Sequence, residues 1–166
     1  MAKMKASGKT VYKAIARGPI FVLDKQEVQI TNATIADPEA EVARVNEAVD
    51  KAKAQIAKLY EKALAEVGEE SAAIFEVHQM MLEDDEYLDS VYGMIRDESL
   101  NAEYAVQMTG NVVSQMFATM DDEYMKARAA DVLDISNRVI RVLTNQDDAN
   151  LDHRKSILVS TIRCNL

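Results

Sequence analysis

Apolar positions in the first long segment recur alternately three and four residues apart: Val42, Val45, Val49, Ala52, Ile56, Leu59 and Ala63. This a/d heptad spacing is typical of a helix that packs lengthwise against another helix. Asp37 and Pro38 together form a helix start, with aspartate as the N-cap and proline at the first helical position. Gly68 is a suitable C-terminal cap. The pattern therefore predicts one long helix that begins at Pro38 and ends near Gly68.

Helical periodicity continues along the chain to about residue 144. A stretch that begins at Ser71 is interrupted by consecutive acids at residues 83–86, which predicts a kinked or broken helix pair. Asn101 is a suitable N-cap for a third helix, and Asp121-Asp122 starts a fourth. The inward positions of the third helix are predicted to include Val112, Val113, Met116 and Met120. Because the connectors are short, we predict a mainly α fold, an antiparallel four-helix bundle, over residues 37–144.

The two ends of the chain favour β-strands instead. Val11–Ile15 and Ile20–Leu23 are short β-favouring runs, and Ser156–Val159 begins like a buried strand close to the last residue. A strand so near a chain end suggests a sheet whose other members are missing. We therefore expect short strand remnants of an incomplete domain in residues 1–36 and 145–166. Whether unpaired strand edges lead to a homodimer is left open.

The composition is that of a folded globular protein. Hydrophobic residues make up 48% of the chain and charged residues 28%, which excludes a disordered class. No stretch approaches the roughly 20 apolar residues of a membrane-spanning helix. The basic start lacks the apolar stretch of a signal peptide. The single cysteine, Cys164, cannot form an internal disulfide, so we expect a cytoplasmic location.

Negative charge is concentrated in one segment. Residues 66–98 contain eleven acidic residues and one basic residue, Arg96, a net charge of −10, whereas the whole chain carries −9. This field would repel nucleic acids and anionic membranes, so neither is an expected partner. A basic protein would be attracted. The alternative is a solvated helix face that is acidic only for solubility.

The residue types leave little room for catalysis. The chain has two histidines, His78 and His153, and one cysteine, and it lacks the Glu-x-x-His motifs of di-iron bundles. Glycine-rich phosphate loops and serine nucleophile signatures are also missing. We therefore predict no metal site and no catalytic residue. His78 is followed by Met80 and Met81, which suits either core packing or an adaptable docking surface.

Two longer stretches are distinctive. Residues 69–84 read Glu-Glu-Ser-Ala-Ala-Ile-Phe-Glu-Val-His-Gln-Met-Met-Leu-Glu-Asp, and residues 120–131 read Met-Asp-Asp-Glu-Tyr-Met-Lys-Ala-Arg-Ala-Ala-Asp. They resemble the "EE.AIFE.H.M.LED" and "DDEY.KERAAD" signatures of Enzyme I of the bacterial phosphoenolpyruvate–sugar phosphotransferase system. Tyr12–Leu23 resembles a divergent form of the family's N-terminal opening. The resemblance is colinear over about residues 8–159.

What the resemblance implies is a role in sugar uptake by phosphoryl transfer. Enzyme I takes a phosphoryl group from phosphoenolpyruvate onto a histidine and passes it to a histidine of HPr, a small basic carrier protein. In this family an α/β domain carries the phosphorylated histidine, and an inserted helical domain binds HPr. Residues 37–144 would correspond to the HPr-binding domain, and residues 1–36 and 145–166 to an incomplete α/β domain. The resemblance assigns these residues to the docking surface: acidic Glu70, Glu76, Asp84 and Glu86, the apolar part His78, Met80, Met81 and Tyr87, and Arg128 at its edge.

The sequence also departs from the family pattern. The "GG.TSH" motif of the phosphorylated histidine is absent, the segment Ser160–Leu166 stands where the family reads "ADDLTPS", and Leu133 replaces an arginine. We therefore interpret the chain as a truncated fragment that supplies the docking surface and is inactive alone. Mg²⁺ and phosphoenolpyruvate would bind the C-terminal domain of the full-length family, so no cofactor is expected here. The alternative is a structural helical-hairpin protein with a merely solubilising acidic face.

Overall fold

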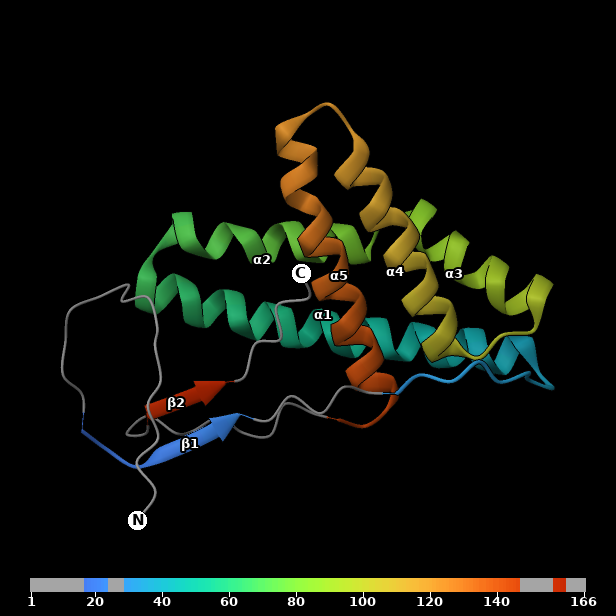
Figure 1. Cartoon of the computed structure of the whole chain (residues 1–166), viewed down its shortest axis with the longest axis horizontal. Helices are drawn as coiled ribbons and strands as arrows, with labels where there is room; N and C mark the ends of the chain where they lie inside the picture. The colour runs from blue at the N-terminus through green and yellow to red at the C-terminus, as the bar shows by residue number, and fades with distance from the viewer. Residues whose placement is uncertain (1–16, 24–28, 147–156, 161–166) are drawn as a thin grey trace, which may run out of the picture. The chain divides into compact units, whose positions relative to one another are not determined.

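The computed structural model describes residues 17–23, 29–146 and 157–160. Within them the chain is mainly helical (Figure 1). The elements are β1 (Ile20–Leu23), α1 (Pro38–Val67), α2 (Glu69–Leu82), α3 (Asp85–Glu98), α4 (Ala102–Thr119), α5 (Glu123–Leu143) and β2 (Ile157–Ser160). The chain divides into two compact units, residues 28–149 and the two ends, 1–27 with 150–166.

Aspartate side chains set the starts of α1 and α3. The Asp37 carboxylate accepts a hydrogen bond from the Ala40 amide at 3.1 Å and begins α1. Asp84 accepts from the Tyr87 amide at 2.9 Å and begins α3. Each bond satisfies one backbone donor that the helix itself leaves unpaired. Gly68 ends α1 with a φ of 92°, a left-handed conformation that glycine adopts without strain.

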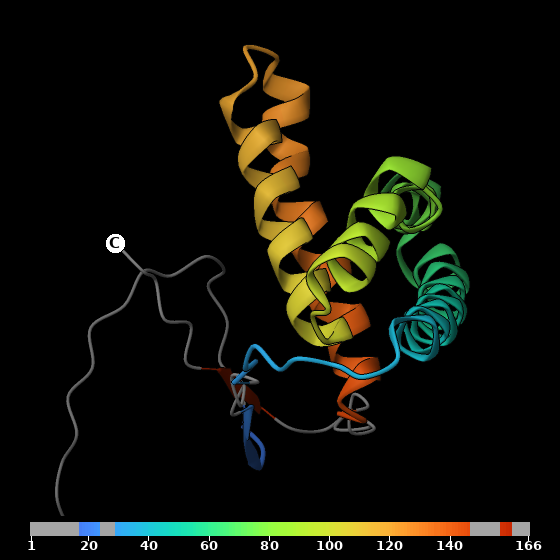
Figure 2. The same cartoon turned by 90° about the vertical axis from the view of Figure 1, so that its right-hand side faces the viewer.

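The helices form two antiparallel hairpins rather than one regular bundle. α1 lies alongside α2, α4 lies alongside α5, and the second pair crosses the first steeply (Figures 1 and 2). The predicted four-helix bundle is therefore not confirmed, because the α4–α5 pair crosses the α1–α2 pair instead of lying along it. The break between α2 and α3 is local: Asp84 adopts an extended conformation and caps a new helix, so the chain changes direction where the acids interrupt the pattern.

The core fills the space where the hairpins meet. Its fully buried side chains include Val45, Ile56, Leu82, Val91, Ile95, Val106, Ile135 and Val139. Small residues bring α4 and α5 together: a Cβ atom added at Gly110 would lie 2.4 Å from Ser136 Oγ. Ser114 Oγ also donates to the Ala129 carbonyl at 2.7 Å. The heptad positions of α1 are largely buried, with Val42, Val45, Val49, Ala52 and Ile56 in the core.

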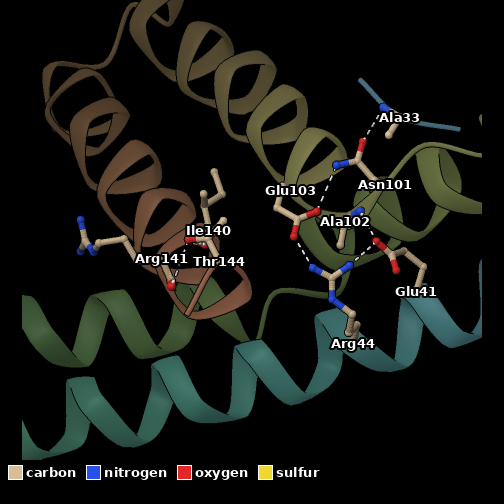
Figure 3. A network of polar contacts seen from close by, with 9 residues as sticks. All are labelled: Ala33, Glu41, Arg44, Asn101, Ala102, Glu103, Ile140, Arg141 and Thr144. Carbon is tan, nitrogen blue, oxygen red and sulfur yellow. Dashed lines mark hydrogen bonds and ion pairs between the residues drawn. The ribbon is translucent and has the colours of Figure 1, made fainter. Parts of the chain in front are cut away.

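A polar network joins the start of α1 to the start of α4 (Figure 3). The Glu41 carboxylate accepts from the Ala102 amide at 2.8 Å, and Arg44 forms ion pairs with both Glu41 and Glu103. Asn101 donates to Glu103 at 3.0 Å and accepts from the Ala33 amide at 3.0 Å. These contacts join residues 33–44 to residues 101–103, which are distant in sequence.

The described strands belong to the unit formed by the chain ends. β1 and β2 pair in parallel, with Ile20 opposite Ile157 and Leu23 opposite Ser160. The predicted strand Val11–Ile15 lies outside the described residues. That the strands are remnants of an α/β domain, and that the domain boundaries fall at residues 36 and 144, stays a prediction.

Candidate functional site

A groove of about 390 Å³ lies among α2, α3, α4 and α5. We call it the methionine groove. Its lining comprises Val77, Met80 and Met81 of α2, Asp84, Glu86, Tyr87 and Ser90 at the start of α3, Val113, Met116 and Phe117 of α4, and Val132 and Ile135 of α5. The break between α2 and α3 therefore lies directly at this site.

The floor of the groove is buried and its rim is exposed. Tyr87, Val132 and Ile135 belong to the hydrophobic core. Met80 and Met116, by contrast, are 62% and 54% exposed. Monomeric proteins seldom leave adjoining apolar side chains in water without a use for them. The groove is thus a hollow with a rigid base and adaptable thioether side chains at its edge.

Tyr87 links two helices at the floor of the groove. Its hydroxyl lies 2.8 Å from Ser136 Oγ, and Ser136 donates its own proton to the Val132 carbonyl at 2.8 Å. The Tyr87 hydroxyl is therefore the donor in the first bond. Burial raises the pKa of Tyr87 to about 12, and the hydroxyl stays protonated at neutral pH. Tyr87 joins α3 to α5 beneath the groove.

The rim of the groove is acidic. Asp84 and Glu86 are exposed, and the lining residues include no basic side chain. The described ion pairs do not include either carboxylate. A cationic group that approaches the groove would therefore meet carboxylates whose charge is not yet compensated.

Some predicted surface residues line this groove and others do not. Met80, Met81, Asp84, Glu86 and Tyr87 belong to its lining, whereas Glu70, Glu76, His78 and Arg128 do not. Glu70 is exposed in the first turn of α2. Glu76 accepts a hydrogen bond from Tyr60 of α1, which raises the Tyr60 pKa. Their assignment to a docking surface stays a prediction.

His78 and Arg128 meet in a separate cluster between α2 and α5. His78 Nε2 lies 3.5 Å from Asp131 Oδ1, and Arg128 donates to Asp131 Oδ2 at 2.9 Å. Arg128 also donates to the Tyr124 hydroxyl at 3.1 Å, and its guanidinium lies 4.7 Å from that ring. The hydrogen bond to Asp131 is the main cause that raises the Arg128 pKa. The positive charge of Arg128 is thus largely compensated within the cluster.

Sequence reasoning missed the α4 and α5 walls of the groove. Val112 and Met116 were expected to point inward, but they are 47% and 54% exposed. This expectation is wrong because helical periodicity marks an apolar face without showing whether another helix covers it. Val132 and Ile135 also line the groove, and their spacing gives no signal that distinguishes a groove floor from the core.

Neither a cluster of metal ligands nor a membrane-spanning helix occurs in the described residues. Within residues 17–23, 29–146 and 157–160, no group of three or more histidine, cysteine, aspartate or glutamate residues lies close enough to hold a metal ion. In the same part of the chain, none of the helices combines the length and apolar character needed to cross a membrane.

Comparisons with known proteins agree on one family. The family model described as "PEP-utilising enzyme, N-terminal" matches residues 7–128. A phosphoenolpyruvate-protein phosphotransferase of Bacillus subtilis is 39% identical over 139 residues, which cover 84% of this chain and 24% of that protein. The Haemophilus influenzae protein of the same name is 35% identical over 158 residues, or 93% of this chain and 28% of that protein. The chain therefore spans about a quarter of the length of these relatives.

Solved structures give the same result. The solution structure of Enzyme I (nEIt) superimposes with a TM-score of 0.75 at 32% identity, covering 87% of this chain and 60% of that chain. The N-terminal domain of Enzyme 1 - Nitrogen superimposes with a TM-score of 0.69 at 24% identity, which supports the fold alone. The chain belongs to the family of PEP-utilising enzymes and corresponds to their N-terminal region.

Proposed function

We propose that this chain is the HPr-docking part of an Enzyme I and that the methionine groove receives HPr. The observation that carries the proposal is that exposed methionines and uncompensated carboxylates occur together in one hollow. A small basic protein with an apolar projection between cationic side chains would complement both features. The family relationship supports this choice of partner, since the relatives are phosphoenolpyruvate-protein phosphotransferases.

The two features have different roles in binding. Asp84 and Glu86 at the rim attract a basic partner over long range, so they mainly raise the association rate and make it depend on salt. Met80 and Met116 lose water only when the partner is seated, so they mainly set the residence time. The rigid floor keeps the groove open before the partner arrives, which lowers the cost of ordering.

Docking is separate from phosphoryl acceptance in this sequence. The phosphohistidine motif of the family is absent from the 166 residues. The His78 side chain is only 13% exposed, which limits its access to a phosphoryl donor. His153 lies outside the described residues. The chain therefore docks HPr without accepting phosphoryl itself, and Mg²⁺ and phosphoenolpyruvate act on another part of the full-length enzyme.

The decisive experiment is a titration with purified HPr at several salt concentrations. The variant Asp84→Asn with Glu86→Gln removes both rim charges, and asparagine still caps α3. Asp97→Asn with Glu98→Gln makes the same charge change at the other end of α3, outside the groove. We expect saturable, salt-weakened binding that the rim variant slows several-fold at low salt and the control leaves nearly unchanged.

Other outcomes would overturn the proposal. Absence of saturable binding would favour the alternative, a structural helical protein whose acidic face only confers solubility. Equal effects of the rim and control variants would show that net charge, rather than the groove, attracts HPr. Incubation with radioactive phosphoenolpyruvate, Mg²⁺ and HPr tests the second part: stoichiometric labelling of this chain would contradict docking without phosphoryl acceptance.

A further inference from the structure

We infer that Met80 and Met116 form an oxidation site through which peroxides weaken docking at the methionine groove; this inference rests on the proposed function. Seven of the chain's methionines lie in the described residues: Met80, Met81, Met94, Met108, Met116, Met120 and Met125. Of these seven, Met80 and Met116 are the exposed ones, and both line the groove. The accessible thioethers of the described chain are thus gathered where a partner would bind.

The remaining described methionines are shielded to a greater extent. All five are half-buried in the helical unit. Met94, for example, packs against the core, and its sulfur accepts a hydrogen bond from the Thr109 hydroxyl at 3.8 Å. Because oxidation follows exposure, a peroxide in solution should react with Met80 and Met116 before the other described methionines.

The reaction needs only the oxidant. A lone pair of the thioether sulfur attacks one oxygen of hydrogen peroxide, an S–O bond forms and the O–O bond breaks. The sulfur is oxidised by two electrons, the peroxide is reduced and one molecule of water leaves. The product, methionine sulfoxide, is a polar group in place of an apolar one, and methionine sulfoxide reductases can reverse the change.

A sulfoxide in this groove would find no hydrogen-bond donor to satisfy it. The lining contains two hydroxyl groups, and both are already donors elsewhere: Ser90 to the Glu86 carbonyl at 2.7 Å and Tyr87 to Ser136. No basic side chain lines the groove, and the rim carboxylates repel the partly negative sulfoxide oxygen. Docking of the partner's apolar projection would therefore bury the sulfoxide without a donor from the groove, which is costly.

The test compares HPr binding by the full 166-residue chain before and after mild hydrogen peroxide. Peptide mass spectrometry locates the sulfoxides, and circular dichroism checks that the helices remain. Among the described methionines we expect sulfoxide first at Met80 and Met116, with unchanged helicity and a dissociation constant raised about tenfold or more. Treatment with a sulfoxide reductase should restore the original value.

Two variants separate the groove methionines from the others. Met80→Leu with Met116→Leu removes the oxidisable sulfurs, so the ratio of dissociation constants after and before peroxide should fall to about one. Met94→Leu with Met125→Leu makes the same number of changes outside the groove and should keep the full ratio. Each protein is compared with itself, so any change in untreated affinity does not matter.

The outcomes distinguish this inference from the proposed function. If untreated chain binds HPr but sulfoxide at Met80 and Met116 leaves the dissociation constant unchanged, the oxidation site is wrong and the docking function stands. If oxidation begins at the half-buried methionines, the exposure argument is wrong. If untreated chain does not bind HPr, the proposed function fails and the regulation of docking fails with it.

Discussion

The methionine groove and the polar network around Arg44 use similar residues in opposite ways. In the network, Glu41 and Glu103 both pair with Arg44, and their oxygens also serve backbone and side-chain donors (Figure 3). In the groove, Asp84 and Glu86 form no described ion pair and border exposed methionines. The negative charges of the network are thus neutralised within the fold, whereas those of Asp84, which also caps α3, and Glu86 have no described cationic partner.

This difference teaches how to separate stability from function in an acidic helical protein. Carboxylates that are compensated inside the structure stabilise the folded state, and their loss should lower the free energy of unfolding. The negative charge of carboxylates that face water contributes little to folding, and its loss should affect encounter with a charged partner. Changes at the two regions should therefore have nearly independent effects on unfolding and on docking.

The largest change is expected at a contact that supports both the stability of the fold and the groove. Gly110→Ala places a Cβ atom 2.4 Å from Ser136 Oγ, and Ser136 holds Tyr87 beneath the groove. Because α4 must move from α5, we expect a loss of about 3 kcal/mol in the free energy of unfolding, together with weaker HPr binding. Urea denaturation measures the first and titration the second.

Gly93→Ala is the matched control for that substitution. Its added Cβ would meet only Asp97 Oδ2, at 3.9 Å. Alanine is also a better helix former than glycine, so this variant should gain up to about 1 kcal/mol. Equal destabilisation by the two variants would show that the contact between Gly110 and Ser136 does not limit helix packing.

The next largest effect is a loss of stability at high pH, caused by the ionisation of Tyr87. Its pKa is raised from 10.0 to about 12 by burial, so between these values the unfolded state binds fewer protons than the folded state. The free energy of unfolding therefore falls as pH rises from about 10 to 12, by about 2–3 kcal/mol. Stability is unaffected by this group below pH 10.

The variant Tyr87→Phe tests whether Tyr87 causes this pH dependence of stability. Phenylalanine does not titrate, so the difference in unfolding free energy between the variant and the parent chain should change across this interval. Denaturant titrations at pH 9, 10 and 11 would measure it. Parallel pH profiles for both proteins would show that Tyr87 is not the group responsible.

A smaller effect is expected from Glu41→Ala in the network. The substitution removes the acceptor for the Ala102 amide at the start of α4 and one partner of Arg44. Loss of such a capping bond costs about 1–2 kcal/mol. HPr binding should not change, because none of these residues lines the groove. Glu47→Ala on an exposed position of α1 is the control, and a loss of docking by Glu41→Ala alone would contradict the separation of the two regions.

The sequence predicted local features better than their assembly. Asp37 and Asp84 show why: a helix start depends on a few neighbouring residues, and the acids at residues 83–86 marked the end of α2 correctly as a break. The steep crossing of the two hairpins depends on contacts between residues distant in sequence, such as Arg44 of α1 and Glu103 of α4, which no local pattern contains.

The same limit applies to the site. Met80, Met81 and Asp84 lie close together in sequence, so a single motif could identify them. Met116 and Val132 reach the groove from other helices, and their apolar periodicity is equally suited to the core. The cluster of His78 and Arg128 was not predicted for a similar reason: Asp131 contacts His78 only because α5 packs against α2.

The smallest effect is expected from Glu76→Gln, which tests how far the docking surface extends from the groove. The resemblance to Enzyme I assigns Glu76 to that surface, but its carboxylate accepts from Tyr60 on the side of α1 and does not line the groove. Glutamine keeps an acceptor for Tyr60, so stability should change by less than about 0.5 kcal/mol. The dissociation constant for HPr should change less than about twofold, against several-fold in association rate for Asp84→Asn with Glu86→Gln. Stopped-flow association at low and high salt compares the two proteins directly. If Glu76→Gln slows association as much as the loss of both rim charges, the docking surface follows the outer face of α2 and the groove is only one part of it.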